Sequence, residues 1–328
     1  MMNKLLDIKD LKVIYKTNNQ ELQAVNGINL AIERKETLGL VGETGAGKTT
    51  TALSIMKLLP ERTGRIKHGS INFDGTDLVN LKDQEMRHIR GSRISMIFQD
   101  PMTSLNPIIT IGKQIEEVLI LHKDNYDEDF NTKDRVNEIL QLVGIDPKRS
   151  NCFPHEFSGG MKQRVVIAMA LACSPELLIA DEPTTALDVT IQAQILMMME
   201  ELKQKFDMSI LLITHDLGVV AKFCDKVAVL YAGEIVEYGT FEDFFINKKH
   251  HPYTDGLFGS IPNILDESDR LTPIEGLMPD PIDLPTGCKF HPRCKNCMEI
   301  CKKEIPQDYD FNGHIIKCHL FKEDKSHG

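Results

Sequence analysis

The chain has 328 residues, of which 41% are hydrophobic and 26% are charged. This length suffices for about two domains, and the composition excludes a disordered chain, a collagen-like repeat and a polytopic membrane protein. Its 38 lysine and arginine residues are outnumbered by 48 aspartate and glutamate residues, which gives a formal net charge of −10. Binding to nucleic acid or anionic lipid would therefore need a local basic patch.

The apolar segments are too short to span a membrane. The most apolar of them, residues 165–173, 177–180 and 210–213, fall far below the ~20 residues that a transmembrane helix needs. Charges interrupt the N-terminal sequence every few residues, so it does not resemble a secretory signal. These patterns predict a cytosolic protein, in which the eight cysteines would stay reduced.

The first part of the chain predicts short strands followed by a nucleotide-binding turn. Strand patterns occupy residues 12–15, 28–32 and 70–73, and turn residues separate them. A further strand, residues 38–41, leads directly into a glycine-rich loop and a helical pattern over residues 49–59. The order strand, loop, helix is typical of folds that bind nucleotide phosphates.

Two amphipathic helices are predicted after Pro107, and they form a candidate helical insert. Their apolar faces consist of Ile111, Ile115, Val118 and Leu119 and of Val136, Ile139, Leu140 and Val143. From residue 157 to about 239, helices alternate with buried strands at residues 177–180, 209–213 and 227–231. This alternation predicts a parallel sheet.

Residues 42–49 fit the pattern G-x-x-x-x-G-K-[ST] of a phosphate-binding loop. Glycines let the backbone N–H groups wrap around phosphates, and the following helix directs its positive end at them. Lys48 is the candidate ligand of the β and γ phosphates, and Thr49 is a candidate Mg²⁺ ligand. The predicted nucleotide-binding residues here are Gly42, Glu43, Thr44, Gly45, Ala46, Gly47, Lys48, Thr49 and Thr50.

Two carboxylates end the apolar strand at residues 177–180. Asp181 is placed to bind Mg²⁺, and Glu182 to orient a water molecule in line with the γ phosphate. Paired acids at the end of a strand are usually only solvated, but hydrolysis of ATP needs both a metal ligand and a base. We therefore predict that Glu182 is the general base.

A second candidate anion site begins the helix that follows Phe157. Ser158, Gly159 and Gly160 start this helix, and adjacent glycines after a serine can form an anion-binding nest there. Ser-Gly-Gly alone is more often an ordinary helix cap. One nucleotide is not expected to need both the phosphate-binding loop at residues 42–49 and this helix start from the same chain. The two sites therefore suggest that two such domains enclose the nucleotide, each contributing one site.

Together these motifs resemble those of ABC transporter ATPases over about residues 5–240, with Walker A at 42–49, the signature at 158–163 and Walker B at Asp181-Glu182. The resemblance implies an α/β fold, a P-loop NTPase core of the RecA type with an antiparallel β subdomain and a helical subdomain at about residues 101–157. It also implies that residues 1–240 form a nucleotide-binding domain that hydrolyses ATP with Mg²⁺.

The same resemblance gives roles to residues that are weak signals alone. Gln99 would be the Q-loop residue that binds Mg²⁺ and senses the γ phosphate, and His215 would be the switch histidine. The remaining assignments are Tyr15, whose ring would stack on adenine, and the D-loop residues Ala186, Leu187 and Asp188. Many family members read Leu-Ser-Gly-Gly-Gln in the signature, whereas this chain has Met161 as the fifth residue and a glutamine only at Gln163.

A narrower resemblance, carried by HPYT at residues 251–254, by the signature and by the cysteine-bearing tail, is to the dipeptide-permease D-type ATPase subunits of dipeptide and oligopeptide importers. It implies a heterodimer with a paralogous ATPase subunit, two integral membrane permease subunits, and an extracellular peptide-binding protein that delivers the solute. The chain would be peripheral, on the cytoplasmic side of the cell membrane.

Two alternative functions share the nucleotide motifs. An ABC ATPase could import another solute such as nickel, since subunits absent here select the solute. An ABC ATPase of DNA maintenance is disfavoured because the chain has one Walker A, no long heptad insertion and an acidic charge balance. A binding module without turnover is disfavoured by Lys48, Asp181, Glu182 and His215.

Beyond residue 240 proline, histidine and cysteine become frequent, and we expect a small irregular cysteine-rich module over residues 241–328. Four thiolates in a cytosolic protein suit zinc or an iron–sulfur cluster. Zinc sites usually pair cysteines two to four residues apart, and the wider spacings here favour a [4Fe-4S] cluster, with zinc as the alternative. Cys297 lies between the second and third predicted ligands, and unliganded cysteines are the other possibility. The predicted cluster ligands are Cys288, Cys294, Cys301 and Cys318.

Overall fold

A computed structural model of the protein describes residues 4–17, 20–185, 187–247, 249–260 and 274–322. The chain forms two compact units. The first unit consists of Met1–Leu5, Ile32–Glu36 and Asn80–Leu212. The second unit consists of Leu6–Ala31, Thr37–Val79 and Ile213–Gly328. Among the described residues, no helix has the length and apolar character needed to cross a bilayer.

A four-stranded sheet with the order β2-β1-β4-β5 lies in the second unit. Its strands are β1 (Lys4–Thr17), β2 (Gln20–Glu33), β4 (Gly64–Phe73) and β5 (Thr76–Asp77). Strand β4 runs antiparallel to both β1 and β5. Apolar side chains that alternate along the strands, such as Leu11, Val13 and Ile71, are buried, as strand periodicity requires. The strand segments expected at residues 12–15, 28–32 and 70–73 fall within β1, β2 and β4.

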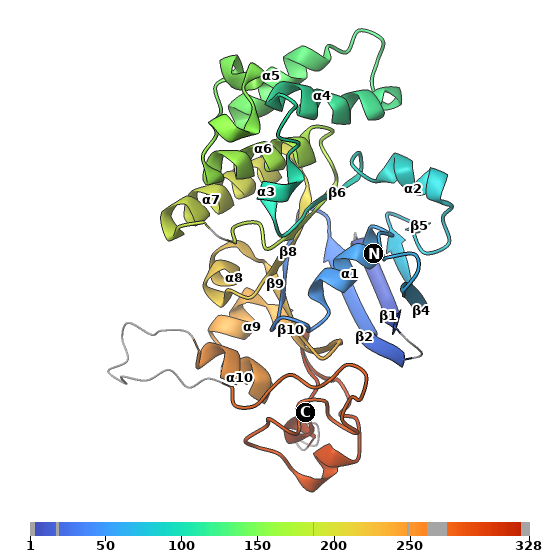
Figure 1. Ribbon diagram of the computed structural model, residues 1–328. Coiled ribbons are helices and arrows are strands. Elements are labelled where there is room, and N and C mark those ends of the chain that lie inside the picture. The colour runs from blue at the N-terminus through green and yellow to red at the C-terminus, as the bar shows by residue number, and fades with distance from the viewer. Residues whose placement is uncertain (1–3, 18–19, 186, 248, 261–273, 323–328) are drawn as a thin grey trace. The chain divides into compact units, whose positions relative to one another are not determined.

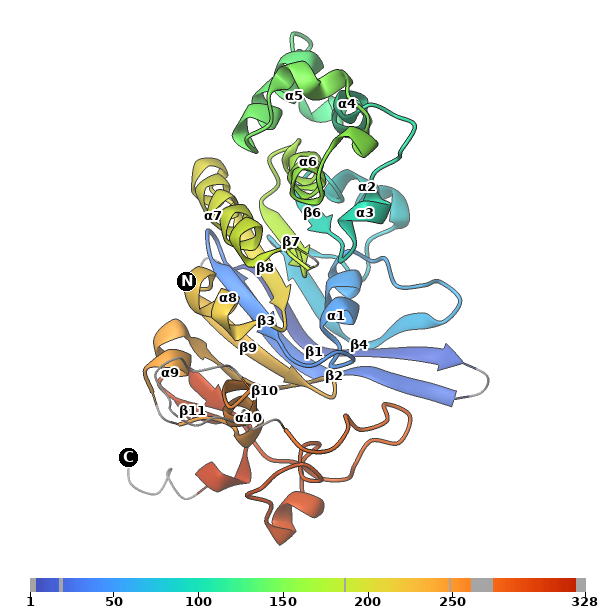
Figure 2. The ribbon, with the colours of Figure 1, turned by 60° about the vertical axis from the view of Figure 1, so that its left-hand side comes forward.

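The second unit also holds five strands in the order β11-β12-β10-β9-β3, and β3, β9 and β10 lie side by side in Figure 2. Strand β3 is parallel to β9, whereas β10 is antiparallel to β9 and to β12. These strands are β3 (Thr37–Val41), β9 (Lys226–Tyr231), β10 (Glu234–Thr240), β11 (Tyr309–Phe311) and β12 (His314–Ile316). The helices of the unit are α1 (Lys48–Ile55), α8 (Leu217–Phe223), α9 (Phe241–Phe245) and α10 (Pro252–Phe258).

Helix α1 is shorter than the sequence pattern suggested. It ends at Ile55 rather than near Leu59, because Lys57 adopts a left-handed backbone conformation with φ 51°. A left-handed residue cannot continue a right-handed helix, and it is costly for a residue other than glycine. The apolar pattern therefore extends about one turn beyond the end of the helix.

A regular hairpin forms in the part of the chain beyond residue 240, where the weak periodicity predicted none. Strands β11 and β12 form a hairpin in which Phe311 pairs with His314 across the turn residues Asn312 and Gly313. Both turn residues have positive φ, 59° and 101°. Asn-Gly is the preferred sequence of such a two-residue turn, so the dipeptide was the available signal for this hairpin.

The first unit holds strands in the order β8-β7-β6, and β6 and β7 are parallel. These strands are β6 (Ile94–Ile97), β7 (Leu177–Asp181) and β8 (Ser209–Thr214). The helices of the unit are α2 (Asp83–Ile89), α3 (Pro101–Ser104), α4 (Ile111–Leu121), α5 (Thr132–Leu142), α6 (Gly159–Leu171) and α7 (Val189–Phe206). All residues of β7 and β8 are buried, as expected for strands covered on both faces.

The predicted helical insert is present as α4 and α5, which contact each other and α6 (Figure 1). Ile111, Ile115 and Leu119 of α4 are fully buried, and so are Ile139 and Leu140 of α5. The apolar faces thus serve to pack the helices together. Asn131 caps α5 by accepting hydrogen bonds from the backbone N–H groups of Lys133 and Asp134, which fixes where this helix begins.

Candidate functional site

The loop over residues 42–49 has a backbone shape that glycine alone permits at two positions. Gly42 and Gly47 have φ of 155° and 108°. A Cβ atom at Gly42 would lie 2.2 Å from the carbonyl oxygen of Leu230, and one at Gly47 would lie 2.5 Å from that of Ala24. The loop therefore leads directly into α1 with its backbone close to the neighbouring chain segments, a form that fits a phosphate-binding loop.

Lys48 lies inside this loop. Its Nζ donates to the carbonyl oxygens of Gly42 at 2.6 Å and of Glu43 at 3.0 Å. Thr49, next along α1, is exposed and so accessible to a metal ion. The hydroxyls of Tyr15 and Thr50 lie 3.3 Å apart, which places the predicted adenine-stacking residue beside the first turn of α1. All these residues belong to the second unit.

Glu43 connects the same loop to the C-terminal region. Its carboxylate accepts hydrogen bonds from Arg293 Nη1 at 2.6 Å and Nη2 at 3.1 Å. Its backbone N–H donates to the hydroxyl of Tyr253 at 2.9 Å. The sequence analysis did not find this contact, because 250 residues separate Glu43 from Arg293.

Walker B lies at the end of β7 in the first unit. Asp181 is the last residue of the strand and is buried, whereas Glu182 follows with a left-handed φ of 48°. The Oε2 atom of Glu182 accepts hydrogen bonds from Gln99 Nε2 and from the hydroxyl of Thr185, each at 3.0 Å. The predicted Q-loop residue and the predicted base are thus brought together, and the carboxylate is held by two donors.

The signature segment also lies in the first unit. Ser158 is the N-cap of α6 and is exposed, as is Gly159, so the first N–H groups of this helix are accessible to an anion. Gln163 is fully buried, and its amide donates to the carbonyl oxygen of Pro183. The glutamine that stands two places later than usual therefore links the signature helix to the residue after Glu182.

The two remaining predicted nucleotide residues each lie at the start of a helix. Asp188 caps α7 through a hydrogen bond from the N–H of Ile191 at 3.0 Å. The D-loop residue Ala186 lies outside the described residues. His215 is exposed between β8 and α8, and its neighbour Asp216 caps α8 by accepting from the N–H of Gly218 at 2.7 Å. These caps fix the backbone on either side of the predicted residues.

The cysteines of the C-terminal region gather in one place. The thiols of Cys288, Cys294 and Cys318 each interact electrostatically with that of Cys301, and Cys318 also interacts with Cys288 and Cys294. The N–H of Cys288 donates to the carbonyl oxygen of Cys301 at 2.8 Å. Backbone N–H groups of Phe290, Asn296 and Leu320 are directed at the sulfur atoms of Cys288, Cys294 and Cys318.

The chemistry of these thiols fits a bound metal centre. All eight cysteines of the chain are among the described residues, and all are free thiols. Burial, together with the neighbouring thiols, raises the pKa of Cys288 to about 11 and that of Cys318 to about 12. Thiolates packed together without a cation are therefore unfavourable, and a metal centre would compensate for this cost. Cys297 interacts most closely with Cys301 and is the fifth sulfur of the group.

A separate buried cluster joins β10 to the C-terminal region. The fully buried Glu237 accepts at Oε1 from His250 Nδ1 and His314 Nε2, each at 2.9 Å. The other ring nitrogen of His250 faces the carbonyl oxygen of Asn247 at 3.1 Å, so both nitrogens carry protons. Burial would raise the pKa of Glu237, but the hydrogen bonds from His250 and His314 outweigh it and lower the pKa. One carboxylate oxygen of Glu237 and one ring nitrogen from each histidine lie within 4.8 Å of one another. The hydrogen bonds between these groups account for their arrangement.

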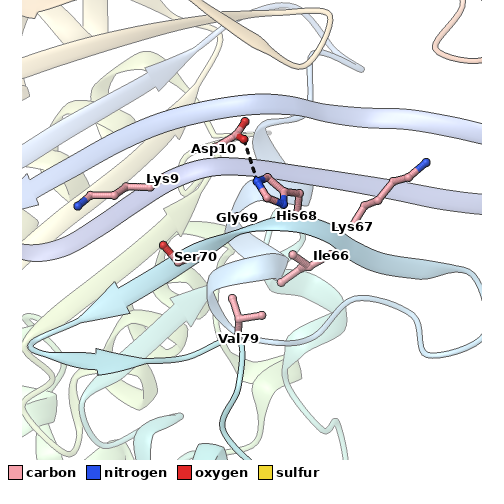
Figure 3. A pocket seen from close by; sticks show the side chains of 8 residues that line it. All are labelled: Lys9, Asp10, Ile66, Lys67, His68, Gly69, Ser70 and Val79. Carbon is pink, nitrogen blue, oxygen red and sulfur yellow. Dashed lines mark ion pairs between the residues drawn. The ribbon is translucent and has the colours of Figure 1, made fainter.

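A pocket of 480 Å³ lies over β1 and β4 (Figure 3), apart from the predicted site residues. An ion pair between His68 and Asp10, 3.1 Å apart, crosses it. None of its lining residues belongs to a nucleotide motif or to the cysteine group. The pocket is lined by Lys9, Asp10, Ile66, Lys67, His68, Gly69, Ser70 and Val79.

Known proteins resemble both parts of the chain. The family model "ABC transporter" matches residues 25–185, and the model "Oligopeptide/dipeptide transporter, C-terminal region" matches residues 236–301. The solved dimer of the ATP-binding cassette MJ0796, in a post-hydrolysis state with ADP and Pi, is 28% identical, with a TM-score of 0.64 over 72% of this chain and 98% of the cassette.

Two curated relatives match nearly the whole chain. The oligopeptide transport ATP-binding protein OppD of Bacillus subtilis is 51% identical over 98% of this chain and 90% of its own length. OppD of Escherichia coli is 48% identical over 96% of this chain and 92% of its own length. Because such identity extends through both the cassette and the C-terminal region, the chain belongs to the family of ABC transporter ATPases that comprises oligopeptide and dipeptide transport ATP-binding proteins.

Proposed function

We propose that this chain hydrolyses ATP to power the import of dipeptides or oligopeptides through an ABC transporter. One observation carries the proposal: relatives about half identical over almost the full length are peptide transport ATP-binding proteins, and the identity includes the C-terminal region. A cassette alone would indicate only an ABC ATPase. No feature of the described residues favours nickel import or DNA maintenance.

In this function each of the predicted site residues has a role in ATP binding or hydrolysis. Lys48 and the loop N–H groups would bind the phosphates, Tyr15 the adenine, and Thr49, Gln99 and Asp181 the Mg²⁺ ion. Bound Mg²⁺ neutralises charge on the β and γ phosphates. Glu182 would take a proton from the attacking water, and its two hydrogen bonds from Gln99 and Thr185 hold its Oε2 atom in one orientation.

The accessible start of α6 supports a role for a second ATPase subunit. Ser158, Gly159 and Gly160 would contact the nucleotide of a paralogous partner, and the partner's signature would complete the site on this chain. The assembly would further contain two membrane permease subunits and a peptide-binding protein outside the cell. The chain would then lie at the cytoplasmic face of the membrane.

Purification from membranes tests this assembly. A tagged chain solubilised in mild detergent should bring down two permease subunits and a paralogous ATPase, identified by mass spectrometry. Vesicles reconstituted with this complex should accumulate labelled di- or oligopeptide only with MgATP and the binding protein. A complex with two copies of this chain would contradict the heterodimer, and accumulation of a metal ion instead of peptide would contradict peptide import.

We further propose that Cys288, Cys294, Cys301 and Cys318 hold a [4Fe-4S] cluster. Its support is the mutual proximity of the four thiols, the burial of Cys301 and Cys318, and the N–H groups directed at three of the sulfurs. Such N–H groups stabilise cluster sulfurs. The cluster would order a loop that has few large apolar side chains of its own.

Protein prepared without oxygen should be brown and contain about four iron atoms per chain. Serine substitution at each of the four cysteines should abolish iron binding, because serine is a poor ligand for iron in such clusters. Cys297→Ser and Cys224→Ser are the matched controls and should keep their iron. Colourless protein with one zinc per chain, or loss of iron in Cys297→Ser but not in Cys294→Ser, would refute the assignment.

A further inference from the structure

Every polar group of Glu43 is engaged, and two of its four partners, Arg293 and Tyr253, lie beyond residue 240. Its carboxylate binds Arg293, its N–H binds Tyr253, and its carbonyl oxygen accepts from Lys48 Nζ at 3.0 Å. Glu43 is therefore a junction between the C-terminal region and the lysine of the phosphate-binding loop. A shift of Glu43 would move an acceptor of that lysine.

Arg293 is held firmly at this junction. Its side chain is 5% exposed, and its Nε donates to the carbonyl oxygen of Glu275 at 3.0 Å. Its guanidinium group also lies 5.8 Å from the centre of the Tyr231 ring. The planar fork that binds both oxygens of Glu43 leaves little rotational freedom, which a lysine would retain. The position of Glu43 thus follows the backbone position of Arg293.

The backbone around Arg293 belongs to the segment that joins Cys288 to Cys294. Arg293 precedes Cys294, and its N–H donates to the carbonyl oxygen of Phe290 at 3.0 Å. The N–H of Phe290 is directed at the sulfur of Cys288. The Phe290 ring packs 5.4 Å from that of Tyr253, the other partner of Glu43. One attachment of Glu43, Arg293, therefore lies in a turn between two predicted cluster ligands, and the other, Tyr253, packs on that turn through Phe290.

We propose that Arg293 is a positioning residue that transmits the state of the cysteine site to the phosphate-binding loop, so that protein with a filled cluster binds nucleotide more tightly than protein without one. This inference rests on the cluster assigned above. A filled site fixes the turn, Arg293 and Tyr253 hold Glu43, and Lys48 stays aligned. Because coupling between two sites is reciprocal, bound nucleotide must also protect the cluster by the same factor.

Calorimetric titration of the full chain with MgADP tests the coupling. Wild type and Arg293→Met are each measured as anaerobically loaded protein and after removal of iron by a chelator. Coupling between sites is typically 5- to 150-fold, and we expect about a tenfold weaker affinity in stripped wild type. Loaded Arg293→Met should bind as weakly as stripped wild type, and stripping should not weaken it further. Arg293→Lys, which keeps the charge but not the fork, should fall between.

Lys317→Met is the matched control. Lys317 also adjoins a predicted ligand, Cys318, and also pairs with a buried glutamate, Glu234 at 2.7 Å, but this glutamate lies on β10 rather than in the phosphate-binding loop. This variant should keep the tenfold difference. As a second measurement, MgADP should slow iron loss to a chelator in wild type and in Lys317→Met but not in Arg293→Met.

Iron content measured on the same samples distinguishes a failure of the cluster proposal from a failure of the coupling proposal. A protein that takes up no iron would overturn the cluster and the coupling together. Iron-loaded wild type with the same MgADP affinity as the stripped protein would overturn the coupling alone. The coupling through Arg293 would also be overturned if iron-loaded Arg293→Met still bound MgADP more tightly than stripped Arg293→Met, because Arg293 would then not transmit the effect.

Discussion

Glu182→Gln should lower ATP turnover of the assembled transporter about 10²- to 10⁴-fold, the range that removal of a general base usually costs. The amide is nearly isosteric with the carboxylate, so the left-handed turn at position 182 and the contact with Thr185 should survive. What is lost is the basic oxygen. MgATP should still bind, and the closed sandwich with the partner subunit should accumulate because its nucleotide is not cleaved.

Steady-state phosphate release and MgATP affinity should be measured on the same preparation. Glu200→Gln, the same chemical change on α7, is the matched control and should leave turnover within a factor of about two, since surface substitutions are usually near neutral. Turnover near the wild-type rate in Glu182→Gln would mean that another group activates the water, and Glu182 would then serve only to orient Gln99.

Lys48→Met should weaken MgATP binding about a hundredfold. A charge-assisted hydrogen bond contributes on the order of 1.5–3 kcal/mol, and the lysine would make two of them to the phosphates. Lys48 Nζ already donates to two carbonyl oxygens of its own loop, so nucleotide binding exchanges these hydrogen-bond acceptors for phosphate oxygens. We therefore expect each hydrogen bond to contribute a free energy at the lower end of that range. Methionine keeps most of the volume of the side chain without its charge.

Equilibrium binding of a fluorescent ATP analogue checks this expectation. Lys57→Met, nine positions along the chain, is the control, because Lys57 Nζ donates to the carbonyl oxygen of Val79 outside the loop. An affinity change below threefold in Lys48→Met would contradict the assignment of Lys48 as the main phosphate ligand. An equal loss in Lys57→Met would point to general destabilisation of the second unit instead.

The nucleotide motifs could be predicted because each is local. Residues 42–49 form a continuous segment whose shape depends on its own glycines, and Asp181 and Glu182 follow four apolar residues that mark the strand. The faces of α4 and α5 were predictable for the same reason, since helical periodicity is a property of consecutive residues. Local chemistry therefore accounts for most of the cassette.

The connections to the C-terminal region could not be predicted in this way. Glu43 and Arg293 meet across 250 positions, and a carboxylate and a guanidinium in a sequence do not indicate which of many charges will pair. Glu237 carries no local signal in the sequence, because its partners His250 and His314 come from two separate segments. Strand β12 has only three residues, too few for a period of two to emerge.

The pairing of β12 with β10 has a consequence for any attempt to isolate the cassette. Tyr238 and Glu237 pair with Ile315 and Ile316, and the N–H of Lys317 donates to the carbonyl oxygen of Val236. Cutting the chain after residue 240 would turn β10 into an open edge strand with unpaired backbone groups and a buried carboxylate newly exposed. Such edges recruit strands from other molecules, so the shortened protein should self-associate rather than behave as a smaller version of the same ATPase.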